Sequence, residues 1–178
     1  MKLLIIFGPP AVGKATIASL IEERTDYKLF HNHMVTDGIM HIFGKESSIE
    51  SRLSKRARTM VIEAAAKANI NLIFTYVWDF SKPRGKHNVD HYKNLYEKHG
   101  GAVQFIELYA PLEERIQRAD SEERWRRKYH TATGKEVEKL EEGRSFISPT
   151  PFYYPDLYTR VDATGDPTRV AARILELM

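Results

Sequence analysis

The sequence predicts a three-layer α/β domain, in which helices cover both faces of one five-stranded parallel sheet. Short apolar runs alternate along the chain with longer segments of helical periodicity. The run at 70–78 is almost continuously apolar or β-branched, which is typical of a strand buried on both faces. A glycine-bounded turn follows the first apolar run and leads directly into a helical segment.

The individual elements follow from these patterns in chain order. Strands are expected at 2–7, 27–31, 70–78 and 103–109, with a short fifth strand ending at 160–162. Helices are expected at 14–24, 35–43, 46–68 and 90–99, from 111 to about 128, and from 167 onward. On the long helix, the apolar face is predicted to consist of Ile49, Leu53, Met60, Ala64 and Ala68.

Length and composition limit the possible classes of protein. A chain of 178 residues is expected to form a single domain over 1–178. With 27 basic and 24 acidic residues the net charge is +3, which suits an anionic ligand without requiring nucleic acid. The absence of cysteine excludes disulfides and thiolate metal sites. The opening apolar run is too short for a signal peptide or membrane span, so a cytoplasmic protein is expected.

The turn after the first strand reads Gly-Pro-Pro-Ala-Val-Gly-Lys-Ala-Thr over residues 8–16 and matches the phosphate-loop pattern G-x-x-x-x-G-K. Pro9 and Pro10 have no N–H, so the amide donors must come from Ala11 onward. The following helix directs the positive end of its dipole at the same point. The predicted phosphate-binding residues are Gly8, Ala11, Val12, Gly13, Lys14, Ala15 and Thr16.

Metal binding is less direct in this loop, because Ala15 stands where a serine or threonine is expected. Magnesium must then rely on Thr16, on water molecules or on a carboxylate elsewhere. Asp79, just after the third strand, is the predicted carboxylate, acting through water. The competing interpretation makes Asp79 a residue that caps a turn.

The loop resembles that of the adenylate kinases, in which glycine follows the lysine and threonine comes next. The length and layout resemble the shikimate-kinase and gluconate-kinase group of P-loop NTPases. This resemblance implies strand order 2-3-1-4-5, a small lid at about 118–146, and ATP-dependent phosphoryl transfer to a small hydroxylated metabolite or nucleotide, with ATP and Mg²⁺ as cofactors. Lys14 would then be catalytic as well as phosphate-binding.

The same resemblance implies an acceptor site. It suggests that Asp37 orients the acceptor hydroxyl and takes its proton late in the transfer, although a helix-start carboxylate explains Asp37 equally well. The segment 79–84 loosely resembles the Asp-Gly-Phe-Pro-Arg segment of adenylate kinases, which adds Arg84. From the residues alone, His31 and His33 favour hydrogen bonding to an acceptor over metal binding. Arg58 could reach an anionic acceptor or belong to a solvated helix face.

The resemblance also assigns residues around the nucleotide. Arg118, at the start of the expected lid, would stack on adenine, and Arg124 or Arg127 would reach the transferring phosphate. The loop after the fifth strand would line the adenine edge through Asp162, Thr164 and Pro167. A solvated charged helix and an ordinary helix-start sequence are the alternative interpretations of these two segments.

Two other functions stay open from the sequence. One is a non-catalytic protein that binds a nucleotide as a structural or regulatory ligand, which Ala15 favours. The other is a nucleic-acid end kinase, suggested by the basic run at 124–128, although interleaved acidic residues weaken that reading. The sequence does not indicate the identity of the acceptor or the oligomeric state.

Overall fold

The computed structural model describes residues 1–45, 47–121 and 132–178. Its sheet contains five parallel strands in the order β2-β3-β1-β4-β5, which confirms the predicted topology. The strands are β1 (Lys2–Phe7), β2 (Lys28–His31), β3 (Leu72–Tyr76), β4 (Ala102–Tyr109) and β5 (Tyr158–Asp162). All five run in one direction, so their carboxyl ends lie at the same edge of the sheet.

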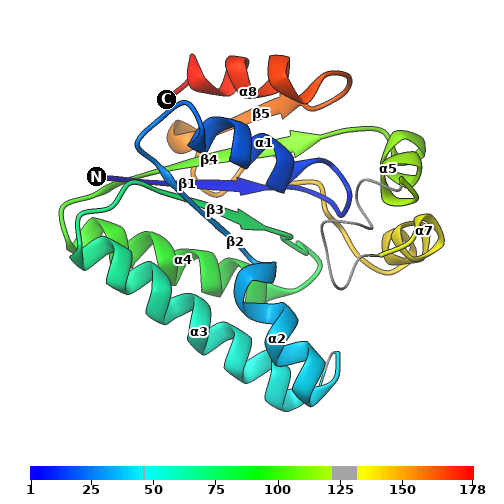
Figure 1. The fold of residues 1–178 in the computed structure, drawn as a ribbon, viewed down its shortest axis with the longest axis horizontal. Coiled ribbons are helices and arrows are strands. Elements are labelled where there is room, and N and C mark those ends of the chain that lie inside the picture. Colours follow the sequence, from blue (N-terminus) through cyan, green and yellow to red (C-terminus); the bar gives the residue numbers. More distant parts are fainter. Residues whose placement is uncertain (46, 122–131) are drawn as a thin grey trace.

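Helices cover both faces of this sheet and extend beyond its carboxyl edge (Figure 1). The bounds are α1 (Lys14–Glu22), α2 (His33–Phe43), α3 (Ser48–Lys67), α4 (Pro83–Lys98), α5 (Leu112–Ala119), α7 (Gly134–Glu142) and α8 (Pro167–Leu175). A 3₁₀ turn, η1, spans Pro155–Leu157. One face of the sheet carries α1 and α8, and the other carries α3 and α4 (Figure 1). The pair α5 and α7 packs together beyond the strand ends.

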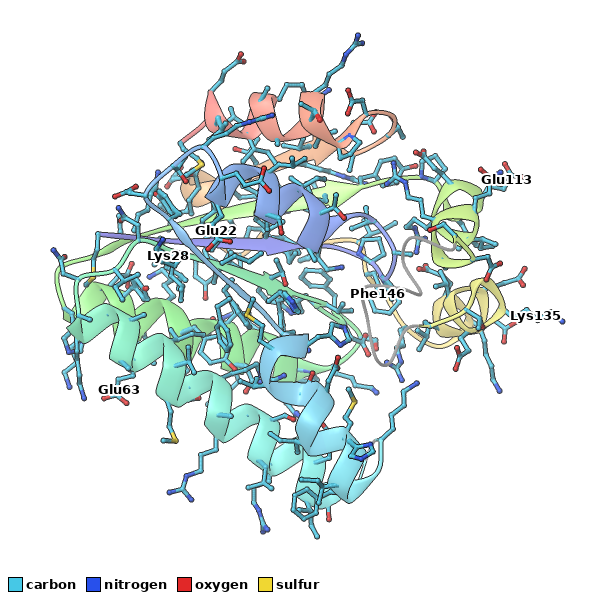
Figure 2. The ribbon with its side chains drawn as sticks, in the orientation of Figure 1. Glu22, Lys28, Glu63, Glu113, Lys135 and Phe146 are labelled. Atoms are coloured by element: carbon cyan, nitrogen blue, oxygen red, sulfur yellow. The ribbon has the colours of Figure 1, made fainter. Side chains whose placement is uncertain are left out.

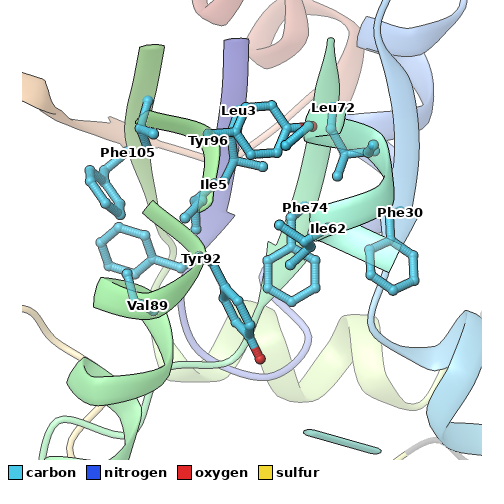
Figure 3. Packing of buried hydrophobic residues seen from close by; sticks show 14 of the residues in the cluster. Leu3, Ile5, Phe30, Ile62, Leu72, Phe74, Val89, Tyr92, Tyr96 and Phe105 are labelled. Carbon is cyan, nitrogen blue, oxygen red and sulfur yellow. The ribbon is translucent and has the colours of Figure 1, made fainter. Parts of the chain in front are cut away.

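Alternation along β1 divides the apolar core into two layers. Leu3 and Ile5 face the α3–α4 side, where they belong to a cluster with Phe74 and Tyr92 (Figure 3). Leu4 and Ile6 face α1 and α8 in a second cluster. Full burial of each aliphatic side chain contributes about 1.5–3 kcal/mol. The central strands are therefore held on both faces, which fixes the turn that leaves β1.

The buried face of α3 differs from the predicted apolar face, and that prediction is wrong. Ile49 and Met60 are 42% and 60% exposed. The buried residues are instead Ser54, Arg58, Ile62, Ala65 and Ala66. The amino-terminal half of this helix borders a cavity that Glu50 and Arg58 line, so polar side chains occupy positions where periodicity predicts apolar ones.

Helix α4 begins at Pro83, seven residues earlier than predicted. Proline at the first position suits a helix start, but Gly85 in the first turn weakens the helical signal. The reason for the glycine is a close contact: a Cβ at Gly85 would lie 2.7 Å from the Trp78 ring. The glycine thus serves packing and does not end the helix.

Beyond β4, the structure also departs from the predicted helix that was to run to about residue 128. Helix α5 ends at Ala119, and Asp120 is its C-cap. The sequence did not predict α7, which starts with a capping box in which Thr133 and Glu136 bond each other's backbone N–H groups. No helix in the described ranges is both long and apolar enough to cross a membrane.

Replacing Gly38 with alanine is expected to stabilise the protein. Gly38 is an exposed position inside α2, and a Cβ there would meet nothing within 4 Å. Alanine restricts the unfolded chain and has a higher helix propensity, so the free energy of unfolding should rise by about 0.5–1 kcal/mol. Urea denaturation measures the change, and a lower midpoint for the variant would contradict this account of α2.

Candidate functional site

The turn between β1 and α1 adopts backbone angles that form a cradle. Gly8, Ala11 and Gly13 have φ values of 145°, 63° and 101°. Gly13 is the N-cap of α1 and provides no side-chain cap, so the first amides of the helix are left to a ligand. The Lys14 Nζ donates hydrogen bonds of 2.8 Å to the Gly8 carbonyl and 2.6 Å to the Pro9 carbonyl. This geometry suits a loop that binds phosphate.

A cavity of about 800 Å³ begins at this loop. Gly13, Lys14, Ala15 and Thr16 line its phosphate end, together with Ala11. Val12 is fully buried, and Gly8 packs closely against β4. Neither residue contributes to the cavity wall. Five of the seven predicted phosphate-binding residues therefore face the cavity, and the other two shape the loop from behind.

Two arginines of α5 attach the phosphate loop to its surroundings. The buried Arg115 donates from Nη1 to the Pro10 carbonyl at 3.4 Å and to Glu141 of α7 at 2.7 Å. Arg118 donates from Nη1 to the Val12 carbonyl at 3.1 Å and from Nη2 to the Ala163 carbonyl at 2.8 Å. Ala11 also packs with Ala119 and Val137, which brings the loop into contact with α5 and α7.

The predicted adenine side is only partly reproduced in the cavity wall. Arg118 and Pro167 line the cavity, with Ala163 and Gly165 between them. Asp162 and Thr164 do not: the Asp162 carboxylate accepts the Thr164 N–H at 2.9 Å, which fixes the turn after β5. Hydrogen bonds from Thr164 lower the pKa of Asp162. In this structure the carboxylate of Asp162 therefore stabilises the turn that leads toward α8.

At the other end of the cavity lies a polar pocket between β2, α2 and α3. His31, Asn32, His33, Arg58 and Thr75 line it. Asn32 is the N-cap residue of α2, but its side chain makes no capping hydrogen bond, and its Oδ1 accepts a 2.6 Å hydrogen bond from Arg58 Nη1 instead. The structure thus brings three of the predicted acceptor residues, His31, His33 and Arg58, to one pocket near Lys14.

Arg58 is a buried cation without a carboxylate partner among the described residues. Arg58 is only 8% exposed, and its Nε makes no hydrogen bond. The buried hydroxyl of Tyr92 interacts with this charge: burial raises the pKa of Tyr92, and the charge of Arg58 partly opposes that effect. A buried guanidinium with unsatisfied donors is costly unless a ligand supplies an anion.

Asp37 and His33 are bonded to each other within α2. The Asp37 Oδ1 lies 2.7 Å from the His33 Nδ1, at i,i+4 spacing. His33 lines the cavity, whereas Asp37 does not. The predicted direct contact between Asp37 and an acceptor hydroxyl stays a prediction; the contact that the structure gives this carboxylate is with His33.

Asp79 and Arg84 lie outside the cavity wall. Burial alone would raise the pKa of Asp79, but hydrogen bonds from Ser81 and from the backbone of Ser145 outweigh it and lower the pKa. The Asp79 Oδ1 accepts the Ser81 N–H at 3.0 Å, the contact expected of a turn-capping aspartate. Arg84 is exposed and donates to the Ser51 hydroxyl, which joins α4 to α3.

The donors present fit a magnesium ion that arrives with a nucleotide. Thr16 offers a hydroxyl beside Lys14, and Thr75 is a second hydroxyl on the cavity wall. Magnesium prefers oxygen ligands and commonly keeps several waters while binding substrate phosphates. Among the described residues, no cluster of three or more acidic or histidine side chains forms a separate metal site. The metal role of Asp79 stays a prediction.

Sequence reasoning missed several cavity residues, including Thr75 and Phe146. Thr75 is a buried polar residue near the end of β3, which was a usable signal, because ligands gather at strand ends in such sheets. Phe146 is almost fully buried, and Figure 2 shows it between the carboxyl edge of the sheet and α7. No sequence pattern distinguishes it from a core aromatic. The predicted catalytic residues Arg124 and Arg127 lie outside the described residues.

Strand order, phosphate loop and cavity together define the P-loop kinase class of fold, and the comparisons agree. Matching solved structures include a sugar kinase from Janibacter sp. HTCC2649 (TM-score 0.65, 17% identity, 99% of this chain and 93% of that chain). They also include a gluconokinase from Sinorhizobium meliloti 1021 (0.61, 13%, 99% and 94%) and the APS kinase of Mycobacterium tuberculosis (0.63, 14%, 99% and 96%). The chain therefore has the fold of the P-loop small-molecule kinases, which confirms the resemblance at the level of fold.

Sequence comparison adds nothing to this assignment. No protein-family model matches the chain. No curated protein matches it either.

Proposed function

We propose that the protein is an ATP-dependent kinase that transfers the γ-phosphoryl group to a hydroxyl of a small metabolite. The observation that carries the proposal is the single cavity that joins the phosphate loop and Lys14 to a polar pocket containing Arg58. Solved structures with this fold include kinases named for sugars, gluconate and APS, which supports the same reaction class. ATP and Mg²⁺ would be the cofactors.

The residues divide between the two substrates. The loop amides and Lys14 would neutralise the β- and γ-phosphates, and the Arg118 side of the cavity would receive the adenine. Thr16 would hold magnesium, which would supply positive charge to offset the negative charge of the phosphates. Because the reaction needs little covalent participation by the protein, positioning and electrostatics supply most of the rate. A lid at about 118–146 that excludes water belongs to the same proposal.

The acceptor is proposed to carry an anionic group as well as a hydroxyl. Arg58 supports this because its buried guanidinium is bonded to the neutral amide of Asn32 and to no described carboxylate. An anion such as a carboxylate, sulfate or phosphate would offset the buried charge of this guanidinium. The neighbouring His31 and Thr75 would complete the hydrogen bonds to such a molecule.

A screen for ATP consumption tests the function. The purified protein is incubated with MgATP and a panel of hydroxylated metabolites, half of them bearing a carboxylate, phosphate or sulfate, and product formation is followed by ³¹P NMR. Phosphorylation of an anionic member is the expected result. Tight MgATP binding without transfer to any acceptor would support the non-catalytic alternative instead.

Arg58→Met is expected to weaken acceptor binding selectively. Loss of a charged hydrogen bond should raise the KM for the anionic acceptor about tenfold to hundredfold and leave the KM for MgATP unchanged. Methionine fills similar space, and removal of the costly buried charge should offset the loss of the hydrogen bond to Asn32, so little change in stability is expected. Steady-state kinetics and urea denaturation measure both effects.

Arg56→Met is the matched control for this prediction, because Arg56 is exposed on the same helix. It should behave like the wild type in both assays. An unchanged acceptor KM in Arg58→Met would contradict the proposal that the acceptor carries an anionic group.

A nucleic-acid acceptor is not favoured by the described part of the site. The basic run at 124–128 that suggested it lies outside the described residues. Oligonucleotide phosphorylation that falls steeply with salt would reverse this preference.

A reaction that draws on cellular ATP would take place in the cytoplasm.

A further inference from the structure

His33 is placed to act on an acceptor hydroxyl. It is the first residue of α2, two positions after the carboxyl end of β2. It lines the same cavity as Lys14 and Thr16, and its side chain is 34% exposed. Asp37, one turn further along α2, has a 21% exposed side chain and does not line the cavity. Of the two residues, the histidine is therefore the one that a ligand in the cavity meets.

The contact between the two residues defines which ring nitrogen is basic. The His33 Nδ1 lies 2.7 Å from the Asp37 Oδ1. A carboxylate only accepts hydrogen bonds, so the ring must donate its Nδ1–H in this contact. In a neutral imidazole the lone pair is then on Nε2, since the hydrogen bond at one nitrogen sets the state of the other.

We propose that His33 is the general base of the phosphoryl transfer and that Asp37 is a positioning residue that acts through it. This inference rests on the proposed kinase function. It differs from the sequence prediction, which gave the acceptor contact to Asp37 itself. An aspartate hydrogen-bonded to the far side of a histidine ring fixes the tautomer and the orientation of that ring. In this role the carboxylate of Asp37 does not need to reach the cavity wall.

The step balances with the groups already named. The acceptor hydroxyl oxygen bonds to the γ-phosphorus of ATP while its proton passes to the His33 Nε2. The bond between the γ-phosphorus and the bridging oxygen to the β-phosphate breaks, and ADP leaves with that electron pair. The His33 imidazolium donates to Asp37 until it returns the proton to solvent. Positioned bases of this kind contribute about 10²–10⁴-fold to a rate.

Nitrogen NMR of the histidine rings tests the tautomer without any substrate. On uniformly ¹⁵N-labelled protein, at alkaline pH where imidazole is neutral, His33 is assigned by loss of its signals in His33→Gln. The wild type should carry the proton on Nδ1. Asp37→Ala should shift His33 toward the Nε2–H form that free histidine prefers. A wild-type His33 with its proton on Nε2 would overturn the proposal.

Kinetics with the acceptor found in the metabolite screen tests the catalytic role. His33→Gln should lower kcat about a hundredfold with an unchanged KM for MgATP. Imidazole added to His33→Ala should restore part of the lost kcat, which a purely structural histidine would not allow. Asp37→Asn, whose amide oxygen can still accept the Nδ1–H, should lose less than His33→Gln.

His41→Ala is the control, because His41 is exposed on the same helix outside the cavity and should leave kcat unchanged. If the wild type is active and His33→Gln keeps its full kcat, this inference fails and the proposed function stands. If the wild type phosphorylates no acceptor, the proposed function fails and this inference fails with it.

Discussion

Lys14→Ala is expected to abolish ATP binding and to lower any phosphoryl transfer about a thousandfold. The Lys14 ammonium is the charged group of the phosphate loop, held by the Gly8 and Pro9 carbonyls at the end of the cavity. Its removal takes away a preorganised donor where charge accumulates, and a single such donor is worth about 10²–10³ in rate even without a formal charge. Isothermal calorimetry with MgATP and the transfer assay measure the two effects.

Two further variants make this expectation specific. Lys14→Met keeps the length of the side chain without the charge and should fail in the same way as alanine. Lys67→Ala removes an exposed lysine that pairs with Glu63 on α3, and should bind ATP as the wild type does. Undiminished heat of ATP binding by Lys14→Ala would mean that the loop holds no polyphosphate, and the proposed function would be lost.

Gly8→Ala is expected to destabilise the whole protein and to disrupt nucleotide binding together with it. Gly8 has a φ of 145°, which side-chain-bearing residues rarely adopt. A Cβ at this position would also lie closer than 3.0 Å to the Leu108 carbonyl oxygen in β4. That neighbour is backbone in the centre of the sheet and cannot rotate away.

The cost of this substitution combines backbone strain with overpacking, and we expect the free energy of unfolding to fall by about 2–5 kcal/mol. Urea denaturation measures the fall, and calorimetry should show a matching loss of ATP affinity. Gly38→Ala adds the same methyl group at an open helical position and is the matched control. Equal stability of Gly8→Ala and the wild type would show that the turn has more room than the structure gives it.

How much of the fold could be predicted depends on the element. All five strands and the glycine-bounded turn were visible because β-branched runs and helical periodicity are local properties of the chain. The strand order was not visible in that way, since it came from the family resemblance. The start of α4 could not be predicted because Gly85 is required by its close packing against Trp78, and the local sequence does not show that contact.

The candidate site was predictable where a backbone motif defines it and less so elsewhere. The spacing of the glycines and the lysine pointed to Lys14, whereas Thr16 stands one place beyond the pattern and was predicted with the help of the family resemblance. The buried side of α3 was missed because Arg58 occupies a core-facing position where helical periodicity predicts an apolar residue. Local rules of this kind are broken most often at functional sites. Asp37 was predicted without His33 as its partner because the helix was expected to begin at residue 35. The i,i+4 pairing exists only because α2 begins at His33.

The attachment of the phosphate loop to α5 and α7 has a consequence for how two substrates communicate. The guanidinium of Arg115 joins the Pro10 carbonyl to Glu141, and Ala11 packs against Ala119 and Val137. A displacement of α7 is therefore transmitted to the phosphate loop through these hydrogen bonds and packing contacts. By thermodynamic reciprocity, an acceptor that favours one position of α7 changes the affinity for ATP by the same factor as ATP changes the affinity for that acceptor.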